Sequence, residues 1–495
     1  MKSSGVSLTR IFHTGAAGGP AASRLWRFEC AKPASCRRSV LSAFRGRCEI
    51  FGLTLVLATA VASVPLAAGP ESGDVTESGK RFVDLLAKED FAGAFAQFDP
   101  RVKQALPETK LRETWQALQA QSGPFKKTLA ARAEKQMGYD VVLVTCEFAR
   151  ATLDTKVVFD AKRQVAGLFF VPTRPAATAT PPPYARTNAF REQQLTVGSG
   201  QWALPGTLSV PTAGGPWPAL VLVHGSGPQD RDETLGANKP FRDLAWGLAT
   251  RGIAVLRYEK RTKEHGLKLM AALHKLTLQE ETIDDALSAV ARLRATAGLD
   301  AKRIFVLGHS LGGLAVPRIG KADPELAGLI ILAGSTRPLE DIIVEQVDYL
   351  VSLDASKAAE ASPKLAEIKA DVAKVKKLTA ADASSTNLLL GAPVVYWLDL
   401  RAYDAPATAR TLKQPLLILQ GQRDYQVTQA DFDGWKKALG ASPNITFKLY
   451  PTLNHLFIAG EGKSTPDEYE QSGHVAETVV ADIAAWILAR NSAGR

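Results

Sequence analysis

A serine flanked by glycines lies past the middle of the chain, in the sequence Gly308-His309-Ser310-Leu311-Gly312. This G-x-S-x-G motif directly follows the apolar run RIFVL, which predicts a strand, and precedes LGGLAVPRI, which predicts a helix. A serine on a tight turn from strand to helix must adopt a strained backbone, and flanking glycines let the chain and the helix pack closely around it. We therefore interpret Ser310 as a nucleophile rather than as an incidental serine of a glycine-rich turn.

A serine hydroxyl is a poor nucleophile until a neighbouring base accepts its proton. His455 fits this role because it lies in the loop 452–455, just after the last predicted strand, NITFKLYP (444–451). That loop is at the carboxyl edge of the predicted sheet, where ligands bind in open α/β sheets. His224 and His309 lie beside strand ends and are expected to be turn or supporting residues. His265 and His274 lie in a polar connection with nothing to position them, and His474 begins the last helix.

The base needs a carboxylate that holds its tautomer and stabilises the imidazolium. Asp424 ends the run PLLILQGQRD, one strand before His455, and so emerges at the same edge of the sheet. The resulting order Ser…Asp…His is the one expected when a serine lies on such a strand-to-helix turn. Two alternatives, Asp399 and Asp404, lie in a predicted cap and are expected to be surface charges or substrate contacts. The other two, Asp431 and Asp433, lie in the helix after Asp424 and are expected to be solvated.

A developing oxyanion needs two fixed hydrogen-bond donors. The backbone N–H of Leu311 follows the nucleophile at the start of a helix, where negative charge is favoured. The second donor is expected in the loop after the strand ALVLVHG, and the backbone N–H of Ser226 is the best candidate.

These residues need a framework, and from about residue 190 short apolar runs alternate with amphipathic helices. Strands that are apolar throughout are buried on both faces, as in a parallel sheet between layers of helices. We therefore predict an α/β fold. A gap of some 80 residues separates two of its strands, and we predict a helical cap inserted at about 335–410, with one helix starting at Ser362-Pro363. A capping box of Thr277 and Glu280 is expected to begin the helix that follows the second strand. The predicted strands span 219–225, 252–258, 303–310, 326–334 and 415–424.

The residues before this framework predict a second, smaller unit over 75–172. Helical spacing of apolar residues comes first and is followed by three predicted strands at 139–148, 155–160 and 164–171. The stretch 173–189 is rich in Pro, Ala and Thr and predicts an extended linker between two domains. The second domain would then span 190–495.

The run HGSGPQDRDETLGANKPFRDLAWGLATRGIAVLRYEKR (224–261), with GHSLGG and GQRDYQV, resembles the α/β-hydrolase superfamily. Within it, the chain resembles bacterial secreted carboxylesterases of the dienelactone-hydrolase-like and serine-aminopeptidase-like group. Residues 75–172, with their terminal GLFFVP, resemble the N-terminal accessory domain of some members and also NTF2-like α+β cones. The resemblance implies a Ser-His-Asp esterase for short acyl esters, without metal or organic cofactor, with the triad on Ser310, Asp424 and His455. True dienelactone hydrolases use a cysteine nucleophile, so Ser310 weakens a lactone assignment.

The distribution of charge and cysteine along the chain bears on its expected location and partners. The chain has 495 residues, a formal net charge of +10 and four cysteines, but seven of those charges and three cysteines lie before residue 70. Residues 1–70 form a basic leader whose apolar segment 51–68 is typical of a signal peptide, with cleavage expected after Ala62 or Ala68. The leader is unusually long, which an early start codon near Val40 would explain. A periplasmic or secreted protein is expected, and a membrane partner only if segment 51–68 is retained as an anchor.

The remaining motifs admit two interpretations each. The loop Pro228–Glu233 would contact substrate, or would be a charged loop in which Arg231 pairs with Asp230 or Asp232. The residues after the next strand (257–261) favour ion pairs over a functional role. A small-molecule ester is the expected substrate. An aminopeptidase or amidase and a non-catalytic binding module are the rival functions, and no basic-aromatic motif after residue 70 supports nucleic-acid binding.

Overall fold

The computed structural model describes residues 74–136, 139–173, 180–353, 358–440 and 442–490. The predicted leader and its apolar segment 51–68 lie outside these ranges. Among the described residues, no helix combines the length and the apolar character needed to cross a bilayer. The part that ends at residue 173 and the part that starts at residue 180 are described separately.

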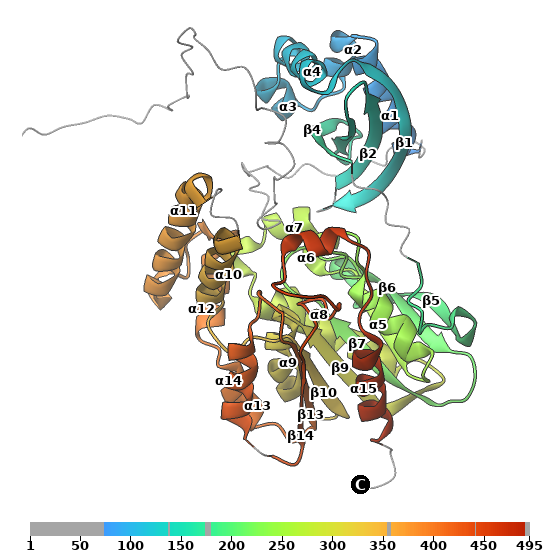
Figure 1. Ribbon diagram of the computed structural model, residues 1–495, viewed down its shortest axis with the longest axis vertical. Coiled ribbons are helices and arrows are strands. Elements are labelled where there is room, and N and C mark those ends of the chain that lie inside the picture. The colour runs from blue at the N-terminus through green and yellow to red at the C-terminus, as the bar shows by residue number, and fades with distance from the viewer. Residues whose placement is uncertain (1–73, 137–138, 174–179, 354–357, 441, 491–495) are drawn as a thin grey trace, which may run out of the picture. The chain divides into compact units, whose positions relative to one another are not determined.

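The N-terminal part has helices on one four-stranded antiparallel sheet, so the predicted α+β unit is confirmed (Figure 1). Phe82, Leu86 and Trp115 from its helices pack against Val142 and Val144 of the sheet. The NTF2-like form of this unit stays a prediction. The elements are α1 (Val75–Ala87), α2 (Phe91–Ala96), α3 (Pro100–Ala105), α4 (Glu108–Ser122), β1 (Phe125–Gln136), β2 (Tyr139–Phe148), β3 (Thr152–Phe159) and β4 (Val165–Pro172).

The second part is built on an eight-stranded sheet in the order β14-β13-β10-β9-β7-β8-β6-β5. From β8 to β14 all neighbouring strands are parallel, whereas β6 pairs antiparallel with both β5 and β8. The predicted α/β fold is therefore confirmed, and within this sheet β6 is the strand that runs opposite to the others. The strands are β5 (Phe190–Val197), β6 (Leu204–Pro211), β7 (Trp217–Val223), β8 (Ala254–Tyr258), β9 (Leu299–His309), β10 (Gly328–Leu332), β13 (Leu416–Gly421) and β14 (Ile445–Tyr450).

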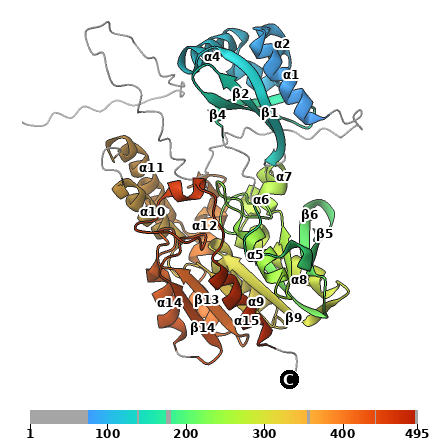
Figure 2. The ribbon, with the colours of Figure 1, turned by 45° about the vertical axis from the view of Figure 1, so that its right-hand side comes forward.

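Helices cover both faces of this sheet (Figures 1 and 2). Alternate residues of each central strand point to opposite faces, so Leu220 and Leu222 of β7 pack with one helical layer and Val221 and Val223 with the other. This double burial explains why the strands are continuous apolar runs. One layer holds α5 (Pro240–Ala249) and α15 (Glu477–Leu488), and the other holds α8 (Asp284–Arg294), α9 (Leu311–Ala322), α13 (Ala405–Arg410) and α14 (Gln429–Leu439).

The residues between β10 and β13 form a mostly helical insertion. Its helix α11 begins at Ala358, so the prediction of a start at Ser362-Pro363 is wrong. The three alanines before Pro363 favour helix, and Pro363 itself lies inside α11, where it cannot donate a backbone hydrogen bond. The insertion contains α10 (Leu339–Leu353), α11 (Ala358–Lys377), the short strands β11 (Leu388–Leu389) and β12 (Ala392–Pro393), and α12 (Val394–Arg401).

The capping box of Thr277 and Glu280 is present, but it does not begin the helix α8 directly. Thr277 N–H donates to the Glu280 carboxylate at 2.9 Å, but the turn that follows is a π-helical one over Gln279–Ile283, and α8 begins only at Asp284. Two short helices precede this turn, α6 (Arg261–Glu264) and α7 (Gly266–Met270).

The described second half of the predicted linker is not an extended spacer. Tyr184 donates its hydroxyl hydrogen to the Val475 carbonyl at 2.7 Å, and Arg186 N–H donates to the Thr250 hydroxyl at 3.0 Å. The Tyr184 ring also lies so close to Gly247 of α5 that a Cβ there would approach it to 2.8 Å. This aromatic anchor fastens the chain just before β5 to the helical layer of α5 and α15.

Candidate active site

Ser310 lies on the turn between β9 and α9, in a strained backbone conformation. Its φ is 55° and its ψ is −117°, a region that a residue with a side chain rarely adopts. The turn also needs its glycines: a Cβ on Gly308 would lie 2.1 Å from the Gly312 carbonyl oxygen, and one on Gly312 would lie 2.3 Å from the Val223 carbonyl oxygen. The G-x-S-x-G sequence therefore follows from the close approach of α9 to the ends of β9 and β7.

His455 and Asp424 lie in contact, as the sequence predicted. The Asp424 Oδ2 atom is 2.7 Å from His455 Nδ1, and both side chains are buried. The backbone N–H groups of Gln426 and Val427 donate to Asp424 Oδ1 at 2.8 and 3.0 Å, and the Gln420 amide donates to Oδ2 at 3.2 Å. A carboxylate fixed in this way places the proton of His455 on Nδ1 and leaves Nε2 to accept a proton.

Asn454, which sequence reasoning did not select, holds the loop that carries His455. Its Oδ1 accepts from the N–H groups of Leu456 and Ile458 at 3.0 and 3.1 Å, and its Nδ2 donates to Glu468 at 3.0 Å. Arg423 pairs with the other side of the same Glu468 carboxylate. An asparagine next to the histidine, in a loop without regular structure, was the available signal.

His309 joins the turn of Ser310 to the loop of His455. Its Nε2 donates to the His455 carbonyl oxygen at 3.0 Å, and its Nδ1 lies 2.9 Å from Oε2 of Glu233. Burial disfavours the charged imidazolium, but Glu233 and the His455 carbonyl outweigh burial, so the pKa of His309 is raised. The pKa of Glu233 is lowered in spite of its burial because His309 faces it. The sequence predicted a supporting role for His309 but gave no partner for it.

The loop after β7 lies against Ser310. A Cβ on Gly225 would lie 3.1 Å from the Ser310 Cβ, and Gly225 is held at both its polar atoms. Its N–H donates to Glu233 Oε1 at 2.6 Å, and its carbonyl accepts from the Lys260 ammonium at 2.7 Å. The two expected oxyanion donors, Ser226 N–H and Leu311 N–H, thus come from the two chain segments that meet at Ser310.

The remaining charged residues of the loop 228–233 form fixed ion pairs, though not those expected. Arg231 pairs with Glu259 at 2.7 Å rather than with Asp230 or Asp232. The carboxylate of Asp232 instead contacts Lys239 at 2.9 Å and also Arg257. Asp230 accepts hydrogen bonds within the loop itself, from Asp232 and Thr234. The interpretation as a locked charged loop is therefore correct. Its partners Arg257 and Glu259 come from β8 and the residue after it, and Lys239 directly precedes α5.

Asp433 is exposed, as expected, and the other three competing acidic candidates have structural contacts. Asp399 pairs with Arg318 at 2.9 Å, and Asp404 accepts from Ala407 N–H at 2.8 Å as the N-cap of α13. The expectation that Asp431 is solvated is wrong, since its carboxylate is fully buried and accepts from the backbone N–H of Thr336 at 2.8 Å. It also pairs with Arg337 and so ties α14 to the start of the insertion.

The competing histidines also have structural positions. His265 was expected to have nothing to position it, yet its Nε2 lies 2.9 Å from the Ala203 carbonyl and its ring packs edge-on against Trp202. His474 pairs with Asp243 at 3.0 Å and lies just before α15, which begins at Glu477. His455 is thus the histidine whose carboxylate partner lies in the segment after β13.

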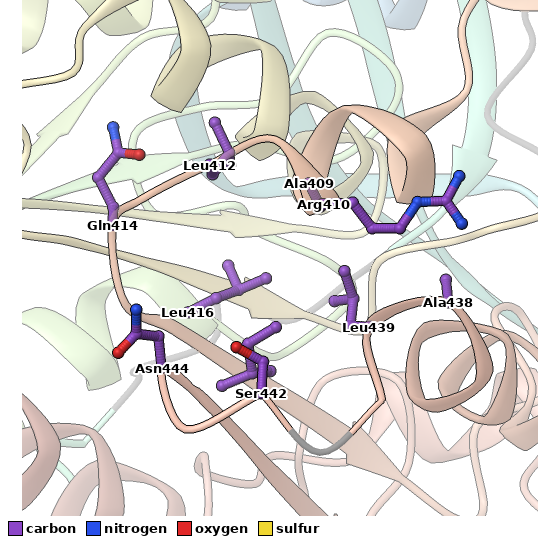
Figure 3. Close-up of a pocket in the computed structure, with 10 residues that line it drawn as sticks. Ala409, Arg410, Leu412, Gln414, Leu416, Ala438, Leu439, Ser442 and Asn444 are labelled. Atoms are coloured by element: carbon purple, nitrogen blue, oxygen red, sulfur yellow. The ribbon is translucent and has the colours of Figure 1, made fainter.

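One cavity of the described surface lies away from these residues. A cavity of about 250 Å³ lies at the amino ends of β13 and β14, where Gln414, Leu416, Ser442 and Asn444 line it (Figure 3). Because these strands are parallel to β9, that cavity is at the opposite edge of the sheet from Ser310. The site is therefore defined by its side chains rather than by this cavity.

A mostly parallel sheet with helices on both faces, a serine on a strained strand-to-helix turn, and an aspartate and a histidine after later strands together define an α/β hydrolase. The family model described as "Serine aminopeptidase, S33" matches residues 219–462, which include Ser226, Ser310, Leu311, Asp424 and His455. Esterase EstD of Thermotoga maritima is 38% identical over 413 residues, which cover 82% of this chain and 94% of EstD. The chain therefore belongs to this family of serine hydrolases.

Two further comparisons complete the description. Residues 80–168 match the family described as "Protein of unknown function (DUF3887)". Among solved structures, the chain is similar to Est1E from Butyrivibrio proteoclasticus, at 15% identity and a TM-score of 0.40, covering 60% of this chain and 98% of Est1E. It is also similar to an acylaminoacyl peptidase from Pyrococcus horikoshii, at 14% identity and a TM-score of 0.42, covering 73% and 51% of the two chains.

Proposed function

We propose that the chain hydrolyses carboxylic esters through an acyl-enzyme on Ser310. The single observation that carries this proposal is the buried contact of 2.7 Å between His455 and Asp424, on loops at the same sheet edge as the strained Ser310. The identity to an esterase over most of its length supports the ester as the bond that is cleaved.

In the proposed reaction, His455 Nε2 takes the proton of the Ser310 hydroxyl as the oxygen attacks the ester carbonyl. The resulting oxyanion accepts hydrogen bonds from the backbone N–H groups of Ser226 and Leu311. His455 then gives its proton to the leaving alcohol, and the acyl group stays on Ser310. A water that loses its proton to His455 attacks the acyl-enzyme and releases the acid.

The helical insertion contacts the loop of Asp424, which supports its proposed role as a cap over the site. Tyr349 of α10 stacks on Tyr425 with a centroid distance of 5.0 Å, and Gln346 donates to the Gln426 carbonyl at 2.8 Å. We propose that this aromatic contact limits the space for the acyl chain and favours short esters. A profile of p-nitrophenyl esters from acetate to palmitate on the intact chain tests this, with the highest kcat/KM expected at four carbons or fewer.

Replacement of the nucleophile tests the central proposal. Ser310→Ala should reduce the turnover of p-nitrophenyl butyrate to background and abolish labelling by a fluorophosphonate probe. Ser288→Ala, on the helix α8, is the matched control and should keep both. Labelling and turnover that survive Ser310→Ala would mean a different nucleophile and would overturn the proposal. A wild-type protein that does not label, with Ser310→Ala behaving like it, would support a non-catalytic binding module.

The second candidate function is an aminopeptidase or amidase, which the description of the matching family favours. The same triad would cleave an amide if the site held the substrate amine. Aminoacyl-p-nitroanilides compared with p-nitrophenyl butyrate discriminate the two, and a higher kcat/KM for the anilides would reverse the assignment.

We also propose that the leader directs export, since the basic flank and the apolar segment 51–68 match a signal peptide. N-terminal sequencing of the mature protein from its native host should find a start at residue 63 or 69. A start before residue 50 would instead support retention of the segment as a membrane anchor.

A further inference from the structure

The orientation of one peptide unit decides whether Ser226 N–H can serve the oxyanion. That N–H belongs to the same planar unit as the Gly225 carbonyl, and the bond is trans, so the carbonyl and the N–H point in opposite directions. Any group that fixes the Gly225 carbonyl therefore also fixes the direction of the Ser226 N–H. Gly225 has no Cβ and its neighbour Ser226 is exposed, so this direction is set mainly by hydrogen bonds.

The Lys260 ammonium is the group that holds this carbonyl. Its Nζ lies 2.7 Å from Gly225 O, and its side chain is only 3% exposed. The Lys260 backbone N–H also donates to the Gln229 carbonyl at 3.1 Å, which fastens the end of β8 to the same loop. Burial of an ammonium group destabilises the fold unless the charge is paired and its other hydrogens also have acceptors.

A second layer of contacts supplies the partner that this charge needs. Glu281 Oε1 lies 3.0 Å from Lys260 Nζ, and Tyr396 donates its hydroxyl hydrogen to Glu281 Oε2 at 2.6 Å. Glu281 comes from the π-helical turn before α8, and Tyr396 comes from α12 of the insertion. The loop of Ser226 is thus connected to the insertion by three consecutive polar contacts among buried side chains.

We propose that Lys260 is a positioning residue of the oxyanion hole, which it serves by fixing the Gly225 carbonyl so that Ser226 N–H points toward Ser310. This inference rests on the proposed function, because it needs Ser226 N–H as an oxyanion donor. Glu281 and Tyr396 hold the ammonium at its place. The ammonium charge next to the Gly225 carbonyl also polarises the peptide unit and makes the Ser226 N–H a stronger donor. A purely structural ion pair would stabilise the same loop without affecting the transition state.

Lys260→Met tests the inference, since methionine keeps most of the volume and removes the ammonium. We expect kcat for p-nitrophenyl butyrate to fall by about 10²-fold, as for the loss of one oxyanion donor, while KM changes by less than about threefold. The thiono analogue of the same ester gives a sharper readout. Its sulfur accepts hydrogen bonds poorly, so an intact oxyanion hole favours the oxo ester strongly, and the ratio of oxo to thiono kcat should fall about tenfold or more in the variant.

Two variants keep the test interpretable if Lys260→Met leaves too little folded protein. Lys260→Met combined with Glu281→Gln removes both charges and keeps an acceptor for Tyr396, so no buried carboxylate is left unpaired. The double variant should show the same loss of kcat and of the oxo/thiono ratio. Arg261→Met is the matched control because it breaks the neighbouring buried pair with Asp285, which does not touch Gly225. It should lower the thermal midpoint and leave the oxo/thiono ratio unchanged.

The outcomes separate the inference from the function it rests on. If Ser310→Ala is inactive but the Lys260 variants keep the wild-type oxo/thiono ratio and kcat, Lys260 is only a structural ion-pair residue and the inference fails. If Ser310→Ala stays active, the proposed function itself fails. Inactive Ser310→Ala together with a lower ratio in both Lys260 variants and not in Arg261→Met supports the inference.

Discussion

The His309 ring holds the backbone of His455: its Nε2 lies 3.0 Å from the His455 carbonyl oxygen, and the two imidazole centroids are 4.6 Å apart. The residue before the proposed nucleophile therefore positions the proposed base. Glu233 extends this connection, since its carboxylate contacts His309 Nδ1 and accepts from Gly225 N–H. The carboxylate of Glu233 and the imidazole of His309 therefore connect the turn of Ser310, the loop of His455 and the loop of Ser226.

Glu233→Ala should therefore impair catalysis although Glu233 is not part of the proposed triad. The change leaves Gly225 N–H and His309 Nδ1 without a partner, which should destabilise the fold by about 1–3 kcal/mol. We expect kcat to fall by roughly 10- to 100-fold, because a displacement of about 1 Å at the site has effects of this size. Steady-state kinetics with p-nitrophenyl butyrate and thermal unfolding of each variant measure the two effects.

Glu233→Gln separates geometry from charge. The Gln amide oxygen can still accept from Gly225 N–H, and its NH₂ can donate to Nδ1 of a neutral His309 whose Nε2–H still binds His455. We expect kcat within about threefold of wild type if position is what matters. Asp232→Asn is the control on the neighbouring residue and should leave kcat unchanged. Wild-type kcat in Glu233→Ala would refute the positioning role.

Asp424→Asn should keep the fold and lose most of the activity. The Asn oxygen can still accept from the N–H groups of Gln426 and Val427, but its NH₂ then faces His455 Nδ1. This favours the tautomer with the proton on Nε2, which cannot accept a proton from Ser310, so kcat should fall by roughly 10⁴-fold. Asp404→Asn, which can still cap α13, should retain full activity. A similar kcat for the two variants would remove Asp424 from the triad.

Gly312→Ala should damage the turn of Ser310 directly. A Cβ there would lie 2.3 Å from the Val223 carbonyl oxygen and 2.6 Å from that of His224, and these backbone atoms cannot rotate away. The start of α9 must then move from β7, and Leu311 N–H moves with it. We expect a loss of stability of about 1–3 kcal/mol and at least a tenfold fall in kcat.

Gly320→Ala is the matched control for that prediction because it makes the same change on the same helix. Its Cβ would lie 2.3 Å from Leu329 Cδ1 and 3.4 Å from Leu412 Cδ1, and both are the ends of flexible side chains rather than backbone atoms. Alanine also favours helix over glycine by up to about 1 kcal/mol. Urea unfolding and kcat should therefore show a normal or more stable, fully active Gly320→Ala protein, and equal damage in both variants would contradict the argument.

The sequence predicted the central strands because each is buried on both faces and is thus a continuous apolar run. The order of Ser310, Asp424 and His455 followed from the strands that precede them, and the structure brings Asp424 and His455 together. The sequence did not predict β1, because its residues FKKTLAARAEKQ are largely polar. Most of the described side chains of β1 are at least partly exposed, and the strand pairs with a neighbour on one side only. Lysines of this kind are common on edge strands and hide the alternation that identifies a strand.

The sequence also did not predict which charged residues are buried. Asp431 has the sequence context of a solvated helical residue, and its partners Thr336 and Arg337 lie more than ninety positions earlier in the chain. Glu233 and Lys260 were likewise recognised as charged but not as partners of Gly225. Such pairs depend on which loops meet at the sheet edge, and local spacing contains no signal for that.

Acid should destabilise the protein through His224. Its ring is buried against Phe241 and Tyr258, and burial lowers its pKa to about 4, an effect that Lys260 increases and Glu233 opposes. Unfolding returns the imidazole to water and to its ordinary pKa near 6.5. Between pH 4 and 6.5 the unfolded chain thus binds a proton that the native chain does not. Stability therefore falls as the pH drops through this range, by up to about 3 kcal/mol from this group.

His224→Phe removes that titration and keeps an aromatic ring between Phe241 and Tyr258. The free energy of unfolding in urea, measured at pH 4.5, 5.5 and 7, should decrease less steeply toward acid in this variant than in wild type, whatever its absolute stability. His274→Gln, at an exposed position, is the control and should keep the wild-type slope. An unchanged slope in His224→Phe would mean that the buried imidazole is already protonated in the native protein, next to Glu233.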